Sequence, residues 1–274
     1  MKQILFFITV MSLAGCAADE QSCRTPSDVP VAIAGGSFEM GKGAIYPEEG
    51  PPRKVAVAAF DIDPSEVTNR QFAAFVADTN HVTVAEKPAP ETGKPGSAVF
   101  TIPTPGNPSW WRWKDGASWR HPDGPGSSIT DKLDYPVVQV AYEDAAAYAK
   151  WAGRALPSAE QWEYAAQGGG AHQPASNSWQ GVFPAYDSAE DGYAGLAPVG
   201  CFEPNGFGLF DMTGNVWELT SSITEGGHVI KGGSYLCADN YCRRARPAAW
   251  QAQELGLGTS HVGFRTVSTP QGSQ

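Results

Sequence analysis

The sequence is poor in positive charge. Its 274 residues include 19 lysines and arginines against 29 aspartates and glutamates, so the formal net charge at pH 7 is −10. A protein that binds nucleic acid through phosphates needs a basic face. The composition therefore argues against nucleic acid as a partner, whereas acidic clusters suit cations. Internal repeats and low-complexity segments are also absent from the sequence.

No apolar run is long enough to cross a bilayer as a helix. The longest, Ile4 to Met11, leads into Leu13-Ala14-Gly15-Cys16, a pattern typical of a secretory signal. The Leu-Ala-Gly-Cys ending resembles a bacterial lipobox, whose cysteine is lipidated, and Ala17 after it resembles the default sorting to the outer membrane. We predict a signal peptide over 1–15 and a lipid anchor on Cys16, hence a periplasmic protein held at the outer membrane. Ordinary cleavage nearby, giving a soluble periplasmic protein, is the alternative.

Cysteines are few, and only four follow Cys16, namely Cys23, Cys201, Cys237 and Cys242. An exported protein meets an oxidising compartment, where a free thiol needs a reason to stay free. Two arrangements remain open. Cys237 and Cys242 are bonded to each other, or they bind a metal ion and leave Cys23 and Cys201 as the disulfide pair by elimination.

Charged residues make up only 18% of the chain, whereas it has 31 glycines, 22 prolines and nine tryptophans. Such a composition suits a loop-rich globular fold better than a helical bundle or a disordered chain. We predict a tether over 16–28 and a single α+β domain over 29–270, with mixed topology and little regular secondary structure.

Local patterns predict a few elements. Val29 to Ile33 and the alternating run 54–60 favour strands. Thr68 is a plausible N-cap for a helix with apolar residues at Phe72, Phe75 and Val76, and further helices are indicated over 142–151 and after Ser158. The Gly-, Pro- and Trp-rich stretch 88–134 is too long for a simple connector and is of the kind that often carries function.

Several motifs identify a family. They are Trp119–Pro125, Trp151–Pro157, Glu160–Ala166, Asn205–Leu209, Gly214–Glu218, Lys231–Tyr235 and Gly263–Arg265. In order and spacing they resemble the formylglycine-generating enzymes, or sulfatase-modifying factors. The resemblance implies a fold related to the C-type lectin-like fold. It also implies oxidation of a cysteine to formylglycine in an unfolded sulfatase segment, typically Cys-x-Pro-x-Arg, with O2 and copper(I).

The last two cysteines match the family's copper ligands. Copper(I) is a soft ion that prefers thiolates, and the spacing of Cys237 and Cys242 lets one loop bring both sulfurs to one ion. A bound metal also explains why two thiols survive in an oxidising compartment. By resemblance, Ser234, Tyr241 and Trp217 lie beside the copper, although packing or backbone hydrogen bonding is an equally good interpretation of these three.

The resemblance also implies two structural calcium ions, which prefer oxygen ligands in irregular loops. The first set is Asn177, Ser178, Asp191 and Tyr193, and the second is Asp211, Gly214, Val216 and Glu218. The alternative is that these carboxylates cap turns without any metal.

The chain departs from the family at several positions. Ala238 stands where a His usually follows the first copper cysteine. Trp250, Gln253 and Gly256 replace polar residues of the substrate groove, and His261 replaces an Asn. A cysteine that many members carry near Ala149, and its disulfide partner near Thr266, are both missing.

Three functions follow from these features. The first is copper-dependent oxidation of a cysteine in an exported protein or peptide substrate. The second is a non-catalytic, copper-binding homologue that helps an exported partner to fold or stay stable. The third is a scaffold lipoprotein in which Cys237 and Cys242 form a disulfide.

Overall fold

The computed structural model describes residues 23–24, 26–170 and 174–270. The α-helices are α1 (Asn69–Thr79), α2 (Tyr142–Trp151) and α3 (Ala159–Ala166), and the 3₁₀ turns are η1 (Pro47–Glu49), η2 (Val84–Glu86) and η3 (Gly168–Gly170). The strands are β1 (Val31–Ile33), β2 (Gly36–Met40), β3 (Arg53–Val57), β4 (Phe60–Ile62), β5 (Gly96–Phe100), β6 (Trp111–Asp115), β7 (Gly181–Val182), β8 (Tyr186–Asp187), β9 (Trp217–Thr224), β10 (Gly227–Lys231), β11 (Trp250–Gln253), β12 (Val262–Gly263) and β13 (Val267–Ser268). Few helices, many short strands and long loops confirm the predicted loop-rich α+β class.

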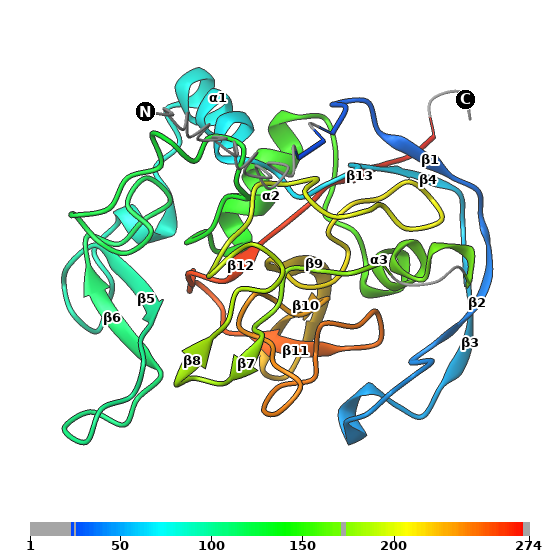
Figure 1. The fold of residues 1–274 in the computed structure, drawn as a ribbon. Helices are drawn as coiled ribbons and strands as arrows, with labels where there is room; N and C mark the ends of the chain where they lie inside the picture. Colours follow the sequence, from blue (N-terminus) through cyan, green and yellow to red (C-terminus); the bar gives the residue numbers. More distant parts are fainter. Residues whose placement is uncertain (1–22, 25, 171–173, 271–274) are drawn as a thin grey trace, which may run out of the picture.

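A four-stranded sheet in the order β11-β10-β9-β12 occupies the centre of the molecule (Figure 1). Its strands are antiparallel except for β12, which runs parallel to β9. A three-stranded sheet, β1-β4-β13, lies to one side, where α3 is placed between it and the central sheet (Figure 1). The hairpin β5–β6 stands at the opposite side, and α1 and α2 lie above the centre.

Side-chain caps start two of the helices where the sequence predicts. Thr68 accepts a hydrogen bond from the backbone N–H of Gln71, whose side chain accepts one from the Thr68 N–H in return. Ser158 and Gln161 form the same reciprocal pair at the start of α3. Such capping boxes satisfy backbone donors that the first helical turn leaves free. The predicted helix over 142–151 is α2.

The prediction of one strand over 54–60 is wrong, because the structure divides it. β3 pairs with β2, whereas β4 pairs with β1 and β13, so the chain changes sheets between Val57 and Phe60. The partner chain turns at the same level, at Gly35. A Cβ at Gly35 would lie 2.8 Å from the Ala59 nitrogen and 2.9 Å from the Val57 oxygen, so the two corners pack only because this residue has no side chain.

The long stretch 88–134 contains the hairpin β5–β6, which the sequence does not reveal. The hairpin is fastened to the chain near the C-terminus. The Ser97 hydroxyl donates to the Gly258 carbonyl at 2.6 Å, and the Phe100 N–H donates to the Ser260 hydroxyl at 3.2 Å. These contacts place the aromatic residues at its turn, Trp110 and Trp111, near the loops that follow β10.

Two apolar clusters form the core. One joins α1 and α2 to the central sheet around Phe72, Trp119, Trp217 and Phe264, and it includes Cys237. The other packs α3 against β1 and β4. In the described ranges, no helix is long and apolar enough to cross a membrane. The predicted signal peptide and Cys16 lie outside the residues that the structure describes.

Candidate functional site

Two unbonded thiols lie side by side in the loop after β10. The Cys237 and Cys242 sulfurs are 3.6 Å apart, and neither cysteine is in a disulfide. A tight turn brings them together, because the backbone N–H of Cys242 donates to the Ala238 carbonyl at 2.9 Å. Cys237 is buried in the core with 3% of its surface exposed, whereas Cys242 is half-buried. The arrangement with Cys237 and Cys242 bonded to each other is therefore not the one that the structure has.

The two thiols differ in acidity. A hydrogen bond from Cys237 lowers the pKa of Cys242 to about 7, and the positive charge of Arg244 lowers it further against the effect of burial. The same hydrogen bond and burial raise the pKa of Cys237 well above its usual value. Cys242 is thus the thiolate of the pair near neutral pH, and Cys237 is the proton donor.

A pocket of about 630 Å³ opens beside the thiols. Most of its wall is aromatic. The lining includes Tyr46, Phe100, Trp110, Trp111, Phe183, Trp217, Tyr241 and His261, together with both cysteines, Ser234 and Arg244. His261 is fully buried from bulk water, which lowers its pKa to about 3, so its imidazole is neutral at physiological pH.

The three residues expected beside the copper all line this pocket. The Ser234 N–H points at the Cys237 sulfur at 3.4 Å, while its hydroxyl accepts from the Leu236 N–H. Trp217 is buried, with 2% of its surface exposed, at the floor of the core. Tyr241 is 58% exposed, and its ring stacks on Trp110 at 4.9 Å.

A clamp that the sequence does not reveal holds the thiol loop from outside. The Arg244 guanidinium donates to a Glu48 oxygen at 2.5 Å and lies 4.0 Å from the centre of the Tyr46 ring. The Tyr46 hydroxyl in turn accepts from the Arg243 N–H at 3.1 Å. The segment around η1 is therefore tied to the loop that carries Cys242, although almost 200 residues separate them.

The expectation that four departures from the family alter one groove is only partly correct. Of these residues, His261 alone lines the thiol pocket. The Trp250 indole donates to the Glu48 carbonyl, and the Gln253 amide donates to the Leu257 carbonyl. Gly256 forms a turn with positive φ. Ala238 is buried and lies, with both cysteines, in the wall of a second cavity of about 310 Å³.

The loops around residues 177–193 bring the first expected calcium set together. The Asp191 carboxylate accepts from the Ser178 and Tyr193 N–H groups. Asn177 is 1% exposed, and its side-chain oxygen has no hydrogen-bond partner. The Gln180 amide nitrogen lies between the Ser178 carbonyl, at 2.6 Å, and Asp191, at 2.8 Å. A buried, unpartnered oxygen among carbonyl and carboxylate oxygens fits a calcium ligand set.

The second expected set lies in a buried acidic cluster. Asp211 and Glu218 are 6% and 0% exposed, and burial raises the pKa of Asp211 to about 6. A third carboxyl, Glu66, was not predicted. One of its oxygens has no partner, and burial together with the Asp211 charge raises its pKa well above the usual value. Arg265 supplies the cluster's cation and pairs with Glu218 at 2.7 and 2.8 Å.

Three carboxyl groups therefore face one guanidinium, and this excess of negative charge fits a divalent cation. The other expected ligands of this set, Gly214 and Val216, have only backbone oxygens to offer. Within the described part of the chain, no three side chains of His, Cys, Asp or Glu converge as a metal site. Only a two-thiol site or sites completed by carbonyls are compatible with these residues.

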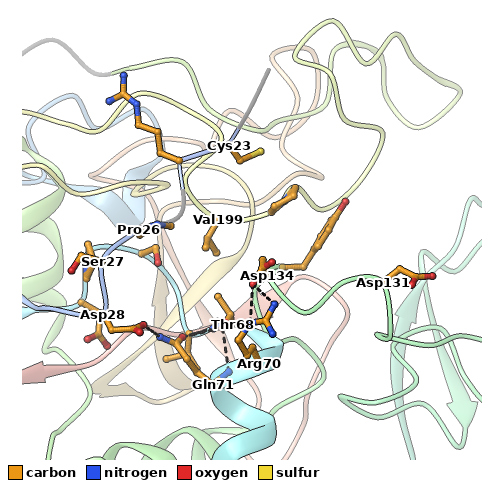
Figure 2. A pocket seen from close by; sticks show the side chains of 17 residues that line it. Cys23, Pro26, Ser27, Asp28, Thr68, Arg70, Gln71, Asp131, Asp134 and Val199 are labelled. Carbon is orange, nitrogen blue, oxygen red and sulfur yellow. Dashed lines mark hydrogen bonds and ion pairs between the residues drawn. The ribbon is translucent and has the colours of Figure 1, made fainter. Parts of the chain in front are cut away.

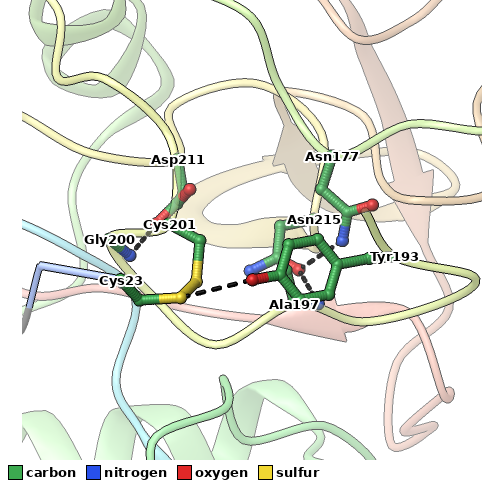
Figure 3. The surroundings of a disulfide bond; sticks show 8 residues. All are labelled: Cys23, Asn177, Tyr193, Ala197, Gly200, Cys201, Asp211 and Asn215. Atoms are coloured by element: carbon green, nitrogen blue, oxygen red, sulfur yellow. Dashed lines mark hydrogen bonds between the residues drawn. A yellow bond between two sulfur atoms is a disulfide. The ribbon is translucent and has the colours of Figure 1, made fainter. Parts of the chain in front are cut away.

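A disulfide joins Cys23 to Cys201 across 178 residues, next to both oxygen-rich sets (Figure 3). The Tyr193 hydroxyl lies 3.2 Å from the Cys23 sulfur, and the Gly200 N–H donates to Asp211 at 2.7 Å. Asn215 links the two sets, because it accepts from Asn177 and donates to Glu66.

A further cavity, of about 440 Å³, lies beside the first residues that the structure describes (Figure 2). Its polar groups already pair with each other. Arg70 donates to Asp134 at 2.9 Å, and Gln71 donates to Asp28 at 2.9 Å. It contains neither thiol of the pair, and we do not consider it the functional site.

The sequence matches the protein family described as Sulfatase-modifying factor enzyme 1-like domain over residues 17–270. The formylglycine-generating enzyme of Mycobacterium tuberculosis is 43% identical over 291 residues, which cover 88% of this chain and 97% of that protein. The mouse protein named Inactive C-alpha-formylglycine-generating enzyme 2 is 38% identical over 270 residues, covering 87% of this chain and 85% of that protein. Among solved structures, PvdO from Pseudomonas aeruginosa shares the fold, with a TM-score of 0.59 at 22% identity over 87% of this chain and 93% of PvdO.

Proposed function

The chain belongs to the Sulfatase-modifying factor enzyme 1-like family, and on that premise we propose that it oxidises a cysteine of a sulfatase-type protein segment to formylglycine. The observation that carries the proposal is the pair of unbonded thiols, 3.6 Å apart, at the wall of an aromatic pocket. The buried sulfur anchors the pair in the core, and the half-buried one borders the pocket.

The residues present fit copper(I). Two adjacent sulfurs, one with a pKa already near 7, form the soft, low-coordinate donor set that this ion prefers. When bound there, copper(I) supplies the electron-transfer chemistry by which O2 oxidises the substrate thiol. An external thiol reductant supplies the remaining electrons.

The chain's own residues prepare the site for this chemistry. The Ser234 N–H holds the Cys237 sulfur in place, and Arg244 favours the thiolate of Cys242. Trp217 and the neutral His261 keep the pocket wall free of charge next to the sulfurs. A substrate cysteine that enters the pocket is thus shielded from water and oriented toward the thiol pair.

Calcium has a structural role in the proposal. Asn177, Ser178, Asp191 and Tyr193 would hold one ion, and Asp211, Gly214, Val216 and Glu218, joined by Glu66, would hold the other. The unpartnered oxygens of Asn177 and Glu66 support both assignments. The ions would balance charge that the fold otherwise buries at a cost.

Export is part of the proposal as well. The sequence pattern at residues 1–16 supports a signal peptide and a lipid anchor on Cys16, which would hold the protein in the periplasm at the outer membrane. A disulfide between Cys23 and Cys201 agrees with an oxidising compartment. The substrate would then be an exported protein.

A second candidate is a copper-binding protein without catalytic activity that assists an exported partner. Ala238 and His261, which stand where the family has other residues, favour it. So does the identity of 38% to a mouse relative whose name calls it inactive. The scaffold function is not carried further, because it requires a bond between Cys237 and Cys242 that the structure does not have.

Mass spectrometry of a Cys-x-Pro-x-Arg peptide separates the two candidates. The peptide is incubated with copper-loaded protein, oxygen and a thiol reductant, with Cys242→Ser as the control. An oxidase replaces the CH2–SH group by an aldehyde and produces the corresponding mass loss only with the unaltered protein. An unchanged peptide beside tightly bound copper would contradict the oxidase and favour the second candidate.

A further inference from the structure

Three aromatic rings from distant segments meet at the mouth of the thiol pocket. Trp110 follows the β5–β6 loop, Phe183 lies in the β7–β8 hairpin, and Tyr241 directly precedes Cys242. Their ring centres are 4.9 to 5.0 Å apart, and the ring planes lie within 16° of each other. Trp110 and Phe183 are half-buried and Tyr241 is 58% exposed. Apolar ring surface is thus left uncovered beside the sulfurs, where burial by a ligand would be favourable.

The same pocket has no partner for a basic side chain. None of the described residues that line it is an aspartate or a glutamate. Its one cation, Arg244, is already paired with Glu48 at 2.5 Å and stacked on Tyr46. The imidazole of His261 faces Trp111 at 4.5 Å between ring centres. A guanidinium or ammonium group placed here would lose water without gaining a carboxylate, which is unfavourable.

We propose that this pocket recognises the residue near the target cysteine as a neutral ring, by contact with Trp110, Phe183 and Tyr241, and that it does not bind the basic residue of the target segment. The inference rests on the proposed function and specifies its substrate class. Proline serves because it is a rigid, uncharged ring, so an aromatic residue serves at the same position. The arginine of a Cys-x-Pro-x-Arg segment lies outside the pocket and contributes little to binding.

Calorimetry on peptides with Ser in place of the target Cys tests the inference. These peptides cannot be oxidised, so the Kd is measured without copper, oxygen or turnover. Relative to Ser-x-Pro-x-Arg, we expect Pro→Ala to weaken binding about tenfold and Pro→Lys to weaken it further, while Pro→Phe retains it. Arg→Ala should change the Kd by less than about threefold, as for a solvent-exposed charge.

Variants of the protein assign the effect to the ring cluster. Trp110→Ala and, independently, Phe183→Ala should each remove the difference between the Pro and Ala peptides. The matched control is Trp113→Ala, because Trp113 is an exposed tryptophan on the same hairpin that does not line the pocket. This control should bind all four peptides as the unaltered protein does. Circular dichroism checks that each variant is folded.

Three results would overturn the inference. They are a larger loss for Arg→Ala than for Pro→Ala, a loss for Pro→Phe equal to that for Pro→Ala, and no binding of any peptide. Failure of the proposed function gives a different pattern, in which the Ser peptides bind in the expected order but the Cys peptide is not oxidised by copper-loaded protein. The two failures are therefore distinguishable.

Discussion

Replacing Asp211 by Asn should stabilise the calcium-free protein at neutral pH, although Asp211 is an expected calcium ligand. Asp211 is fully buried, and its pKa is raised from 3.8 to about 6. A carboxyl group with a raised pKa in the folded state keeps its proton there while the unfolded chain releases it. Stability is therefore present below pH 4 and is lost as the pH rises through 6.

The magnitude follows from the shift. About two pKa units correspond to about 3 kcal/mol of unfolding free energy. In the presence of a chelator, the free energy of unfolding of the unaltered protein should fall by about this amount between pH 4 and pH 7 relative to that of Asp211→Asn. The amide of Asn can still accept the Gly200 hydrogen bond. Calcium should reverse the order, because the carboxylate is the better ligand.

Urea unfolding of both proteins, with calcium and with chelator, at several pH values, measures these differences. Asp131→Asn is the control, because this exposed carboxylate lies outside the cluster. Its curves should follow those of the unaltered protein. The reasoning would be refuted if Asp211→Asn were less stable than the unaltered protein at pH 7 in chelator, or if calcium stabilised both equally.

Two other predictions concern the cysteines. Changing Cys23 and Cys201 together to Ser should lower the free energy of unfolding by about 5 kcal/mol, since the bond closes a loop of 178 residues; an unchanged urea midpoint would contradict this. Cys237→Ala should raise the alkylation pKa of Cys242 in metal-free protein from about 7 toward its ordinary value, and Arg244→Gln should raise it less, because the Cys237 hydrogen bond is the larger cause. Iodoacetamide rates across pH measure both shifts, and a larger effect of Arg244→Gln would show that the order of causes is wrong.

Local signals predict part of the fold well. Thr68 and Ser158 mark helix starts because a cap acts within one turn of the chain. The sheet change between Val57 and Phe60 escapes such reasoning, since it depends on the close approach of Gly35 from another segment. The hairpin β5–β6 is missed for a similar reason, because its anchors, Gly258 and Ser260, lie far along the chain.

The candidate site follows the same division. Cys237 and Cys242 are found from the sequence because one short loop carries both ligands. Glu66 and the clamp of Tyr46 on Arg244 are not, because their roles arise only when segments about 150 to 200 residues apart are brought together. A buried acidic residue just before the Thr68 cap is a weak signal in the sequence.

The central claim is that one copper ion, held between the Cys237 and Cys242 sulfurs, oxidises the substrate cysteine. Copper(I) is titrated into metal-free protein under reducing conditions, and the initial rate of aldehyde formation on a Cys-x-Pro-x-Arg peptide is measured at each point after oxygen is admitted. The account predicts a linear rise that ends at one copper per chain and is absent in Cys237→Ser and Cys242→Ser. A rate that does not depend on copper, or that persists in either variant, would contradict it.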